Sequence, residues 1–215
     1  MAYYNGNLAF LLLITMLFCV TATEDESAEC SKINSVEEIC TLTMFPNSCY
    51  NSLVMNLAPN VTTQPEIIYM KSVQVTMAEV SRTTRDFSEN GTLQKLVVRK
   101  SKDKEPALSA MGICRELLSL AMDNVNKSSS SNDGSSLEKI SYENIRSWLS
   151  AAATDLQTCE DGFEDLSKEV RNIAAVKLKN STEYTSNTLA IATEIGKCEK
   201  ATREHLQTAN SNARK

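Results

Sequence analysis

The sequence predicts an all-α fold: an antiparallel up-and-down four-helix bundle, preceded by an N-terminal helical hairpin and stapled by disulfides. One observation is a seam from Tyr142 to Val170, in which apolar residues recur at alternating intervals of four and three, as in a long helix with one buried face. Another is that 215 residues contain only six glycines and four prolines, which argues against a turn-rich all-β fold. The seam consists of Ile145, Leu149, Ala152, Leu156, Cys159, Phe163, Leu166 and Val170.

The first 22 residues have the features of a signal peptide. Leu8 to Val20 is an uncharged apolar run of 13 residues, and it ends near the small residue Ala22. Such a run is short for a membrane span. The preceding segment has no Lys or Arg, so an uncleaved anchor is the alternative. We expect residues 1–22 to be removed and the mature chain, beginning near Thr23, to be secreted with no membrane attachment.

Residues 23–58 are predicted to form the helical hairpin. Short apolar groups flank Phe45-Pro46-Asn47, where proline and asparagine favour a turn. Cys40 and Cys49 bracket this turn, and a disulfide between them would contribute roughly 2 to 3 kcal/mol by closing a short loop. Two unpaired thiols are the alternative.

The bundle is expected to span residues 59–200 and to be followed by a polar, frayed tail, 201–215. Pro65 and Pro106 open its first two long helices. Between them lies a basic segment, 95–104, which is either a contact for acidic polysaccharide or a solvated connection or frayed helix end. A Ser-rich run from Asn126 predicts a flexible connector, and a fourth helix is expected after a break at 177–181. The core stripes are Met70, Val73, Met77, Val80, Thr84 and Phe87; Ala107, Met111, Cys114, Leu118, Ala121 and Val125; and Tyr184, Thr188, Ile191, Ile195 and Cys198.

Six cysteines remain once Cys19 of the N-terminal apolar run is set aside, and an even number in a secreted chain favours disulfides among many possible pairings. Cys114 and Cys159 lie on the seams of consecutive helices, which can bring two sulfurs within disulfide range. Cys30 and Cys198 would share one end of the bundle and could form a third bridge; free thiols or an intermolecular bridge remain open. Glycosylation triplets begin at Asn60, Asn90, Asn126 and Asn180.

The residues needed for catalysis do not converge in this sequence. The single histidine, His205, lies in the predicted tail, and no glycine-rich nucleotide loop occurs. The acidic cluster from Glu160 to Asp165 is typical of a solvated helix face. A net charge of −5, without a basic patch in which aromatic residues are interleaved, argues against binding of nucleic acid. We expect a protein that is not an enzyme and binds no cofactor or metal.

Three segments resemble the plant invertase and pectin methylesterase inhibitor family across essentially the whole mature chain. They are Cys40 to Cys49 (CTLTMFPNSC), Trp148 to Phe163 (WLSAAAT followed by TCEDGF), and Ser186 to Ile191 (SNTLAI). The resemblance implies the bundle and hairpin, with bridges Cys40–Cys49 and Cys114–Cys159. The residues LSAAAT and TCEDGF are closer to those of the pectin methylesterase branch, and the Pro-Lys-Phe motif common in invertase inhibitors is absent.

The resemblance also implies a function: one-to-one inhibition of a pectin methylesterase in the plant cell wall by blocking its pectin-binding cleft. Inhibition of invertase, a role as the pro-region of a pectin methylesterase zymogen, and a purely structural wall protein are the alternatives. The expected contact surface consists of polar residues off the seams of the second and third long helices. The candidates are Arg115, Glu116, Asp155, Gln157, Thr158 and Glu160.

Overall fold

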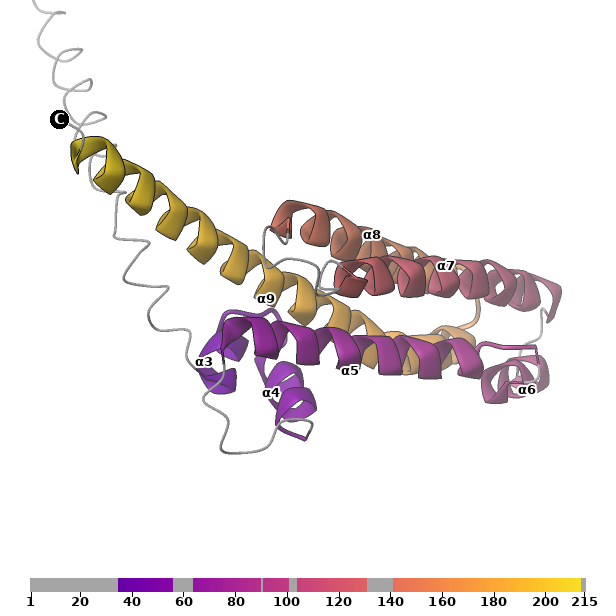
Figure 1. The fold of residues 1–215 in the computed structure, drawn as a ribbon. Coiled ribbons are helices and arrows are strands. Elements are labelled where there is room, and N and C mark those ends of the chain that lie inside the picture. Colours follow the sequence, from indigo (N-terminus) through magenta and orange to yellow (C-terminus); the bar gives the residue numbers. More distant parts are fainter. Residues whose placement is uncertain (1–34, 56–63, 90, 101–103, 131–140, 214–215) are drawn as a thin grey trace, which may run out of the picture. The chain divides into compact units, whose positions relative to one another are not determined.

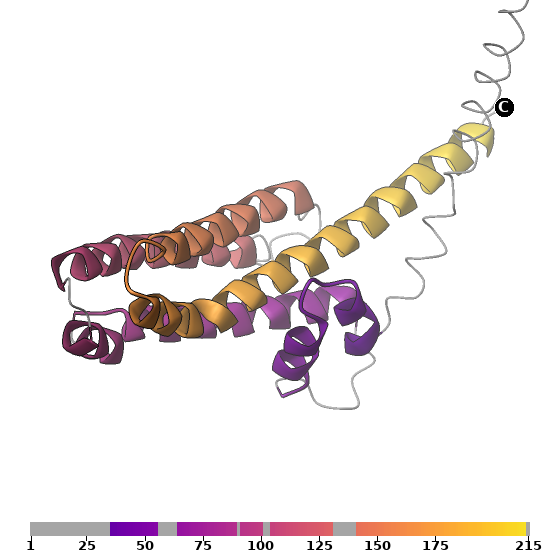
Figure 2. The same ribbon diagram turned by 180° about the vertical axis from the view of Figure 1, so that it is seen from behind.

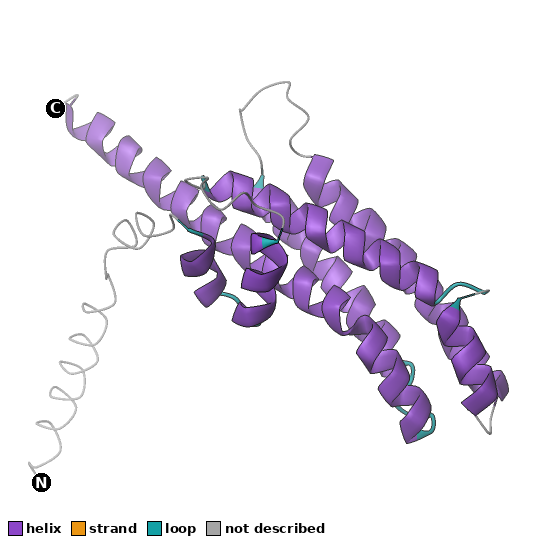
Figure 3. Ribbon diagram, turned by 90° about the horizontal axis from the view of Figure 1, so that it is seen from below, coloured by secondary structure: helices purple, strands orange, loops and turns teal. Residues whose placement is uncertain are grey.

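The computed structural model describes residues 35–55, 64–89, 91–100, 104–130 and 141–213, and every regular element within these ranges is an α-helix (Figure 1, Figure 3). The described residues up to Lys197 belong to one compact unit, and the part of α9 from Cys198 onward belongs to another. The helices are α3 (Val36–Thr41), α4 (Pro46–Val54), α5 (Pro65–Asp86), α6 (Thr92–Lys100), α7 (Lys104–Ser130), α8 (Tyr142–Asp161) and α9 (Lys168–Ala213).

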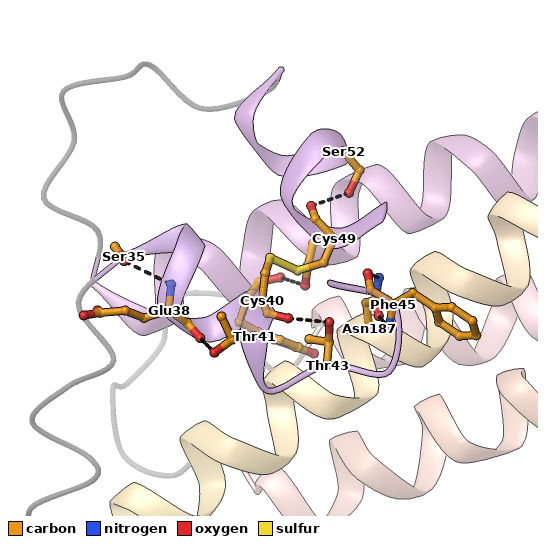
Figure 4. Close-up of a disulfide and its surroundings, with 11 residues drawn as sticks. Ser35, Glu38, Cys40, Thr41, Thr43, Phe45, Cys49, Ser52 and Asn187 are labelled. Atoms are coloured by element: carbon orange, nitrogen blue, oxygen red, sulfur yellow. Dashed lines mark hydrogen bonds between the residues drawn. A yellow bond between two sulfur atoms is a disulfide. The ribbon is translucent and has the colours of Figure 1, made fainter. Parts of the chain in front are cut away.

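The short helices α3 and α4 form the hairpin that the sequence predicts. The Ser35 hydroxyl caps α3 by accepting a hydrogen bond from the Glu38 N–H at 3.1 Å. Pro46 occupies the first turn of α4, where its missing N–H costs nothing. Cys40 and Cys49 are both buried and form a disulfide with their Cα atoms 5.6 Å apart (Figure 4). The turn at Phe45 and Pro46 is therefore clamped from both sides.

A buried asparagine fixes this hairpin to α9. The Asn187 side chain accepts a hydrogen bond from the Phe45 N–H and donates one to the Phe45 carbonyl, both at 3.1 Å (Figure 4). Asn187 is buried, so both polar groups of its amide are satisfied away from water. The Ser48 hydroxyl adds a hydrogen bond to the Glu183 carboxylate of α9. The hairpin thus packs against the bundle at a defined register.

Helices α7 and α8 lie side by side and carry the second disulfide (Figure 1, Figure 2). All six predicted seam residues of α7 are buried, as are the seam residues of α8 from Ile145 to Cys159. Cys114 and Cys159 are bonded, with 4.5 Å between their Cα atoms. The structure therefore confirms a disulfide-stapled, all-helical fold.

The prediction of one helix from Tyr142 to Val170 is wrong, because α8 ends at Asp161. The Gly162 N–H bonds the Thr158 carbonyl as the helix closes, and a turn leads to α9, where the Ser167 hydroxyl accepts from the Val170 N–H at 3.4 Å. Phe163 lies in this turn and is still fully buried, with its ring edge-on to Phe87 at 6.0 Å. The apolar period therefore continues through the turn, so periodicity alone hides the break.

The predicted break at residues 177–181 is also wrong. Helix α9 runs without interruption from Lys168 to Ala213, and Leu178 and Ser181 are fully buried within it. The described residues of the predicted tail are helical as well. A polar stretch can remain in a helix when its hydroxyls find partners on a neighbouring helix.

Those partners lie on α5. The hydroxyls of Thr76 and Thr188 are 2.9 Å apart, and those of Thr83 and Ser181 are 2.8 Å apart. Of the predicted α5 stripe, Val73, Val80 and Phe87 are buried, but Met70, Met77 and Thr84 are only half-buried. The buried face of α5 therefore differs from the predicted stripe, because a pattern of apolar residues leaves out the buried hydroxyl residues Thr76 and Thr83.

Within the described residues, helix extends into both segments for which a connector was considered. Residues 95–100 of the basic segment belong to α6, whose Leu93 and Val97 are buried, and Lys104 begins α7. Helix α7 continues to Ser130, and the Ser128 carbonyl accepts a hydrogen bond from the Tyr69 hydroxyl at 2.9 Å. Burial raises the pKa of Tyr69 to about 12, so this donor stays protonated.

The two disulfides are expected to differ in their effect on stability. Replacing both Cys114 and Cys159 by alanine should lower the free energy of unfolding by roughly 4 kcal/mol, because that bridge closes a loop of 45 residues. Replacing Cys40 and Cys49 should cost roughly 2.6 kcal/mol, since that loop spans nine. Urea unfolding of both double variants measures the difference, and a larger loss in the hairpin pair would contradict the order given.

Two helix glycines provide a matched test of packing. A Cβ at Gly112 of α7 would have its nearest neighbour, the Arg115 side chain, 3.8 Å away, whereas a Cβ at Gly196 of α9 would lie 2.9 Å from Tyr142 Cβ. Gly112→Ala should therefore raise the free energy of unfolding by up to about 1 kcal/mol through helix propensity. Gly196→Ala should lower it by about 1 to 2 kcal/mol through overpacking. Equal gains in thermal unfolding would show that α9 does not approach Tyr142 closely.

Candidate functional site

The outward side of the α7–α8 pair carries two exposed aliphatic residues. Ile113 is 56% exposed and Leu120 is 51% exposed. They lie at positions i and i+7 of α7, with Asn124 at i+11, so the three share one side of the helix. Because Cys114 next to Ile113 faces α8 and is buried, this side lies just outside the stapled seam.

A matching stripe runs along α8. Ala151, Asp155 and Thr158 occupy positions i, i+4 and i+7. The Asn124 amide donates a hydrogen bond to the Asp155 carboxylate at 3.3 Å, which joins the stripes of the two helices. We call the surface formed by Ile113, Leu120, Asn124, Ala151, Asp155 and Thr158 the α7–α8 outer face.

Asp155 is the charged residue among these six, and its surroundings oppose its charge. Partial burial raises the pKa of Asp155 above its ordinary value, and the hydrogen bond from Asn124 offsets only part of that rise. The pKa of Glu160 is raised too, first by burial and then by repulsion from Asp161 and Glu164. The two carboxylates lie five positions apart and so face different sides of α8.

The six interface residues expected from the sequence do not share one surface. Asp155 and Thr158 belong to the α7–α8 outer face, and Glu116 is exposed between Ile113 and Leu120. The Gln157 amide is exposed and donates to the Asp161 carboxylate at 2.7 Å. Arg115 lies on the flank of α7 opposite Ile113, 3.7 Å from the Glu89 carboxylate, and Glu160 lies on the flank of α8 opposite Thr158.

Reasoning from polar residues alone missed Ile113 and Leu120. The signal was present in the sequence, because both aliphatic residues fall outside the heptad seam of α7. A large apolar residue off the seam has no partner within the bundle, which makes it a candidate for contact with another molecule.

A concave feature lies between the hairpin and α9. This groove has a volume of about 530 Å³, and we call it the hairpin groove. At its side the Lys179 ammonium lies 2.6 Å from the Glu183 carboxylate. Burial favours a higher pKa for Glu183, but hydrogen bonds from Lys179 and Ser48 outweigh it and hold that pKa below its usual value. The groove is lined by Met44, Phe45, Pro46, Asn47, Ser48, Asn51, Lys179, Asn180, Glu183 and Tyr184.

The remaining candidate residues are placed as follows. Asn126 is exposed near the end of α7, and Asn180 lines the hairpin groove, whereas Asn60, Asn90 and Cys30 lie outside the described residues. Cys198 is disulfide-bonded. The described part of the chain contains no group of three or more His, Cys, Asp or Glu side chains suited to a metal ion. Nor does any of its helices combine the length and apolarity needed to span a membrane.

The comparisons with known proteins agree with an inhibitor-type domain. Residues 34–191 match the family model described as "Plant invertase/pectin methylesterase inhibitor". The Arabidopsis thaliana protein named "Putative pectinesterase/pectinesterase inhibitor 24" is 36% identical over 166 residues, which are 76% of this chain. The chain spans only 27% of that relative's length.

A shorter relative and a solved structure match over nearly their whole length. "Pectinesterase inhibitor 11" of Arabidopsis thaliana is 26% identical over 194 residues, 88% of this chain and 95% of that protein. The crystal structure of a mutant form of a pectin methylesterase inhibitor from Arabidopsis superposes with a TM-score of 0.50 at 17% identity, covering 77% of this chain and 95% of that one. This likeness supports the shared fold. Since the family model spans most of the chain, the chain belongs to the plant invertase/pectin methylesterase inhibitor family.

Proposed function

We propose that the chain is a proteinaceous inhibitor of pectin methylesterase. It forms a one-to-one complex that blocks the pectin-binding cleft and so regulates the de-esterification of pectin in the cell wall. Family membership supports a protein partner, and a relative named as a pectinesterase inhibitor matches along 95% of its own length. We further propose that the chain acts outside the cell after loss of its N-terminal apolar segment.

The observation that carries this proposal is the pair Ile113 and Leu120 on the α7–α8 outer face. Exposed aliphatic side chains surrounded by polar ones have the composition of a protein contact surface. The Cys114–Cys159 disulfide holds the two helices together before any partner binds. A surface organised in advance loses less conformational entropy on binding, which favours affinity.

A second candidate is the pro-region of a pectin methylesterase zymogen. The two relatives named simply as pectinesterases match over 30% and 28% of their length, so a domain like this one is a minor part of those proteins. Inhibition of invertase is a third candidate, because the family description includes it. Both use the same scaffold, so enzyme assays are needed to separate them.

The direct test is acid release from methylated pectin by a plant pectin methylesterase, titrated with the purified, oxidised protein. We expect inhibition that is complete at one equivalent. The same preparation is titrated against a cell-wall invertase. Inhibition of invertase alone would favour that alternative, and inhibition of neither enzyme would contradict the proposal.

Substitutions on the outer face should weaken inhibition without unfolding the protein. Ile113→Asp and Leu120→Asp should each raise the inhibition constant by roughly thirtyfold, the effect of losing a contact worth about 2 kcal/mol. Val176→Asp is the matched control, because Val176 is 73% exposed on α9 and lies outside this face. If all three variants lost inhibition equally, the outer face would not be the contact surface.

The pH dependence of inhibition should report on Asp155. A partner that covers this carboxylate removes more water from it and raises its pKa further, so binding takes up a proton. Affinity should then increase as the pH falls from about 7 toward about 4, and it should level off below the pKa of the free protein. Asp155→Asn keeps a carbonyl to accept from Asn124 and should remove this part of the pH dependence. An unchanged pH profile in Asp155→Asn would place Asp155 outside the interface.

A further inference from the structure

Asn180 begins a glycosylation triplet, and its side chain lines the hairpin groove. It lies within α9, where it is partly exposed. Within the described residues, no hydrogen bond or ion pair engages its side-chain amide, in contrast to Asn187 seven positions later. The amide nitrogen of Asn180 is therefore free to carry a substituent that extends into the groove.

We propose that Asn180 carries an N-linked glycan and that the first sugars of this glycan lie in the hairpin groove. The inference depends on entry into the secretory pathway, as proposed above, and not on which enzyme is inhibited. In the transfer, Asn180 Nδ2 forms a bond to the anomeric carbon of a lipid-linked oligosaccharyl pyrophosphate. The bond between that carbon and the pyrophosphate oxygen breaks, and lipid pyrophosphate and one amide proton leave.

Thr182 supplies an independent observation. The acceptor triplet requires a hydroxyl two residues after the asparagine. The Thr182 hydroxyl is buried and has no hydrogen-bond partner, so the fold does not use it. A buried hydroxyl without a partner destabilises a folded protein. No hydrogen bond of the described fold requires this hydroxyl, so it is available to the transfer reaction, which acts on the chain before it folds.

The lining of the groove suits a saccharide. Phe45 and Tyr184 provide aromatic rings for the apolar faces of sugar rings, and Asn47, Asn51 and Ser48 provide hydrogen-bonding groups. The volume of about 530 Å³ falls within the range of ligand-sized sites, roughly 300 to 1,000 Å³. The groove is open to solvent, which leaves a path for the rest of the glycan.

Asn126 provides the contrast within the same chain. It is exposed on α7 and does not line the hairpin groove. The Ser128 hydroxyl of its triplet bonds the Val125 carbonyl at 2.6 Å, so the fold does use that hydroxyl. A glycan on Asn126 would extend into solvent without contacting the hairpin.

A glycan in the hairpin groove would connect the hairpin to α9 in addition to the Asn187 and Ser48 hydrogen bonds. It would also cover this side of the molecule, which would leave the α7–α8 outer face as the surface for a protein partner. The glycan would therefore stabilise the hairpin without contributing to inhibition.

Two variants of one residue test this inference. Thr182→Val removes the hydroxyl that the glycosylation triplet requires but keeps the side-chain shape, and it breaks no hydrogen bond of the described fold. Thr182→Ser keeps the hydroxyl and therefore the triplet. The wild type and both variants are secreted from plant cells with their own N-terminal segment and treated with a peptide glycosidase in heavy-oxygen water. Peptide mapping then locates the asparagines that were converted to labelled aspartate.

We expect label at position 180 in the wild type and in Thr182→Ser and its loss in Thr182→Val. Hydrogen exchange of the amides of residues 41–51 should be faster in Thr182→Val than in Thr182→Ser, with inhibition unchanged. An unlabelled Asn180 in the secreted wild type would overturn the proposal, whatever the state of Asn126. Equal exchange in the two variants would overturn the placement of the sugars in the groove.

Discussion

The Cys114–Cys159 disulfide is the constraint on which the rest of this structure depends. It joins the buried seams of α7 and α8 at one point and sets which residues of the two helices lie opposite each other. Once that register is set, Ile113, Leu120 and Asp155 face outward on the same flank, and Asn124 reaches Asp155. A surface for a partner therefore follows from the way the core is closed.

The other half of the unit is held by a different kind of contact. Between α5 and α9, hydroxyl pairs such as Thr76 with Thr188 and Thr83 with Ser181 replace part of the apolar core. Each contributes only about 1 kcal/mol, but its direction allows one register of the helices and penalises the others. The Asn187 amide fixes the position of the hairpin in the same way, because it bonds both the N–H and the carbonyl of Phe45.

The disulfide between α7 and α8 and the hydrogen bonds between α5 and α9 are both suited to a molecule that acts by binding. A disulfide-linked helix pair presents a preorganised face, and the hydrogen-bonded half orients the hairpin and its groove. The proposed role requires a surface of suitable shape and polarity, and it requires no reacting group. The perturbed pKa of Asp155 follows from partial burial at that surface and gives it a means of responding to pH.

The sequence by itself determined the helical class, the hairpin turn at Phe45 and Pro46, the seams of α7 and α8, and the family resemblance. Each follows from local propensity or from apolar spacing along one helix. The tertiary structure decided where α8 ends, because Phe163 keeps the apolar period while it packs on Phe87 across a turn. It also decided the continuity of α9 through Ser181 and the separation of Arg115 from Asp155, because both depend on which groups of other helices lie opposite. Spacing along one chain shows which residues share a face, but only packing shows what that face meets.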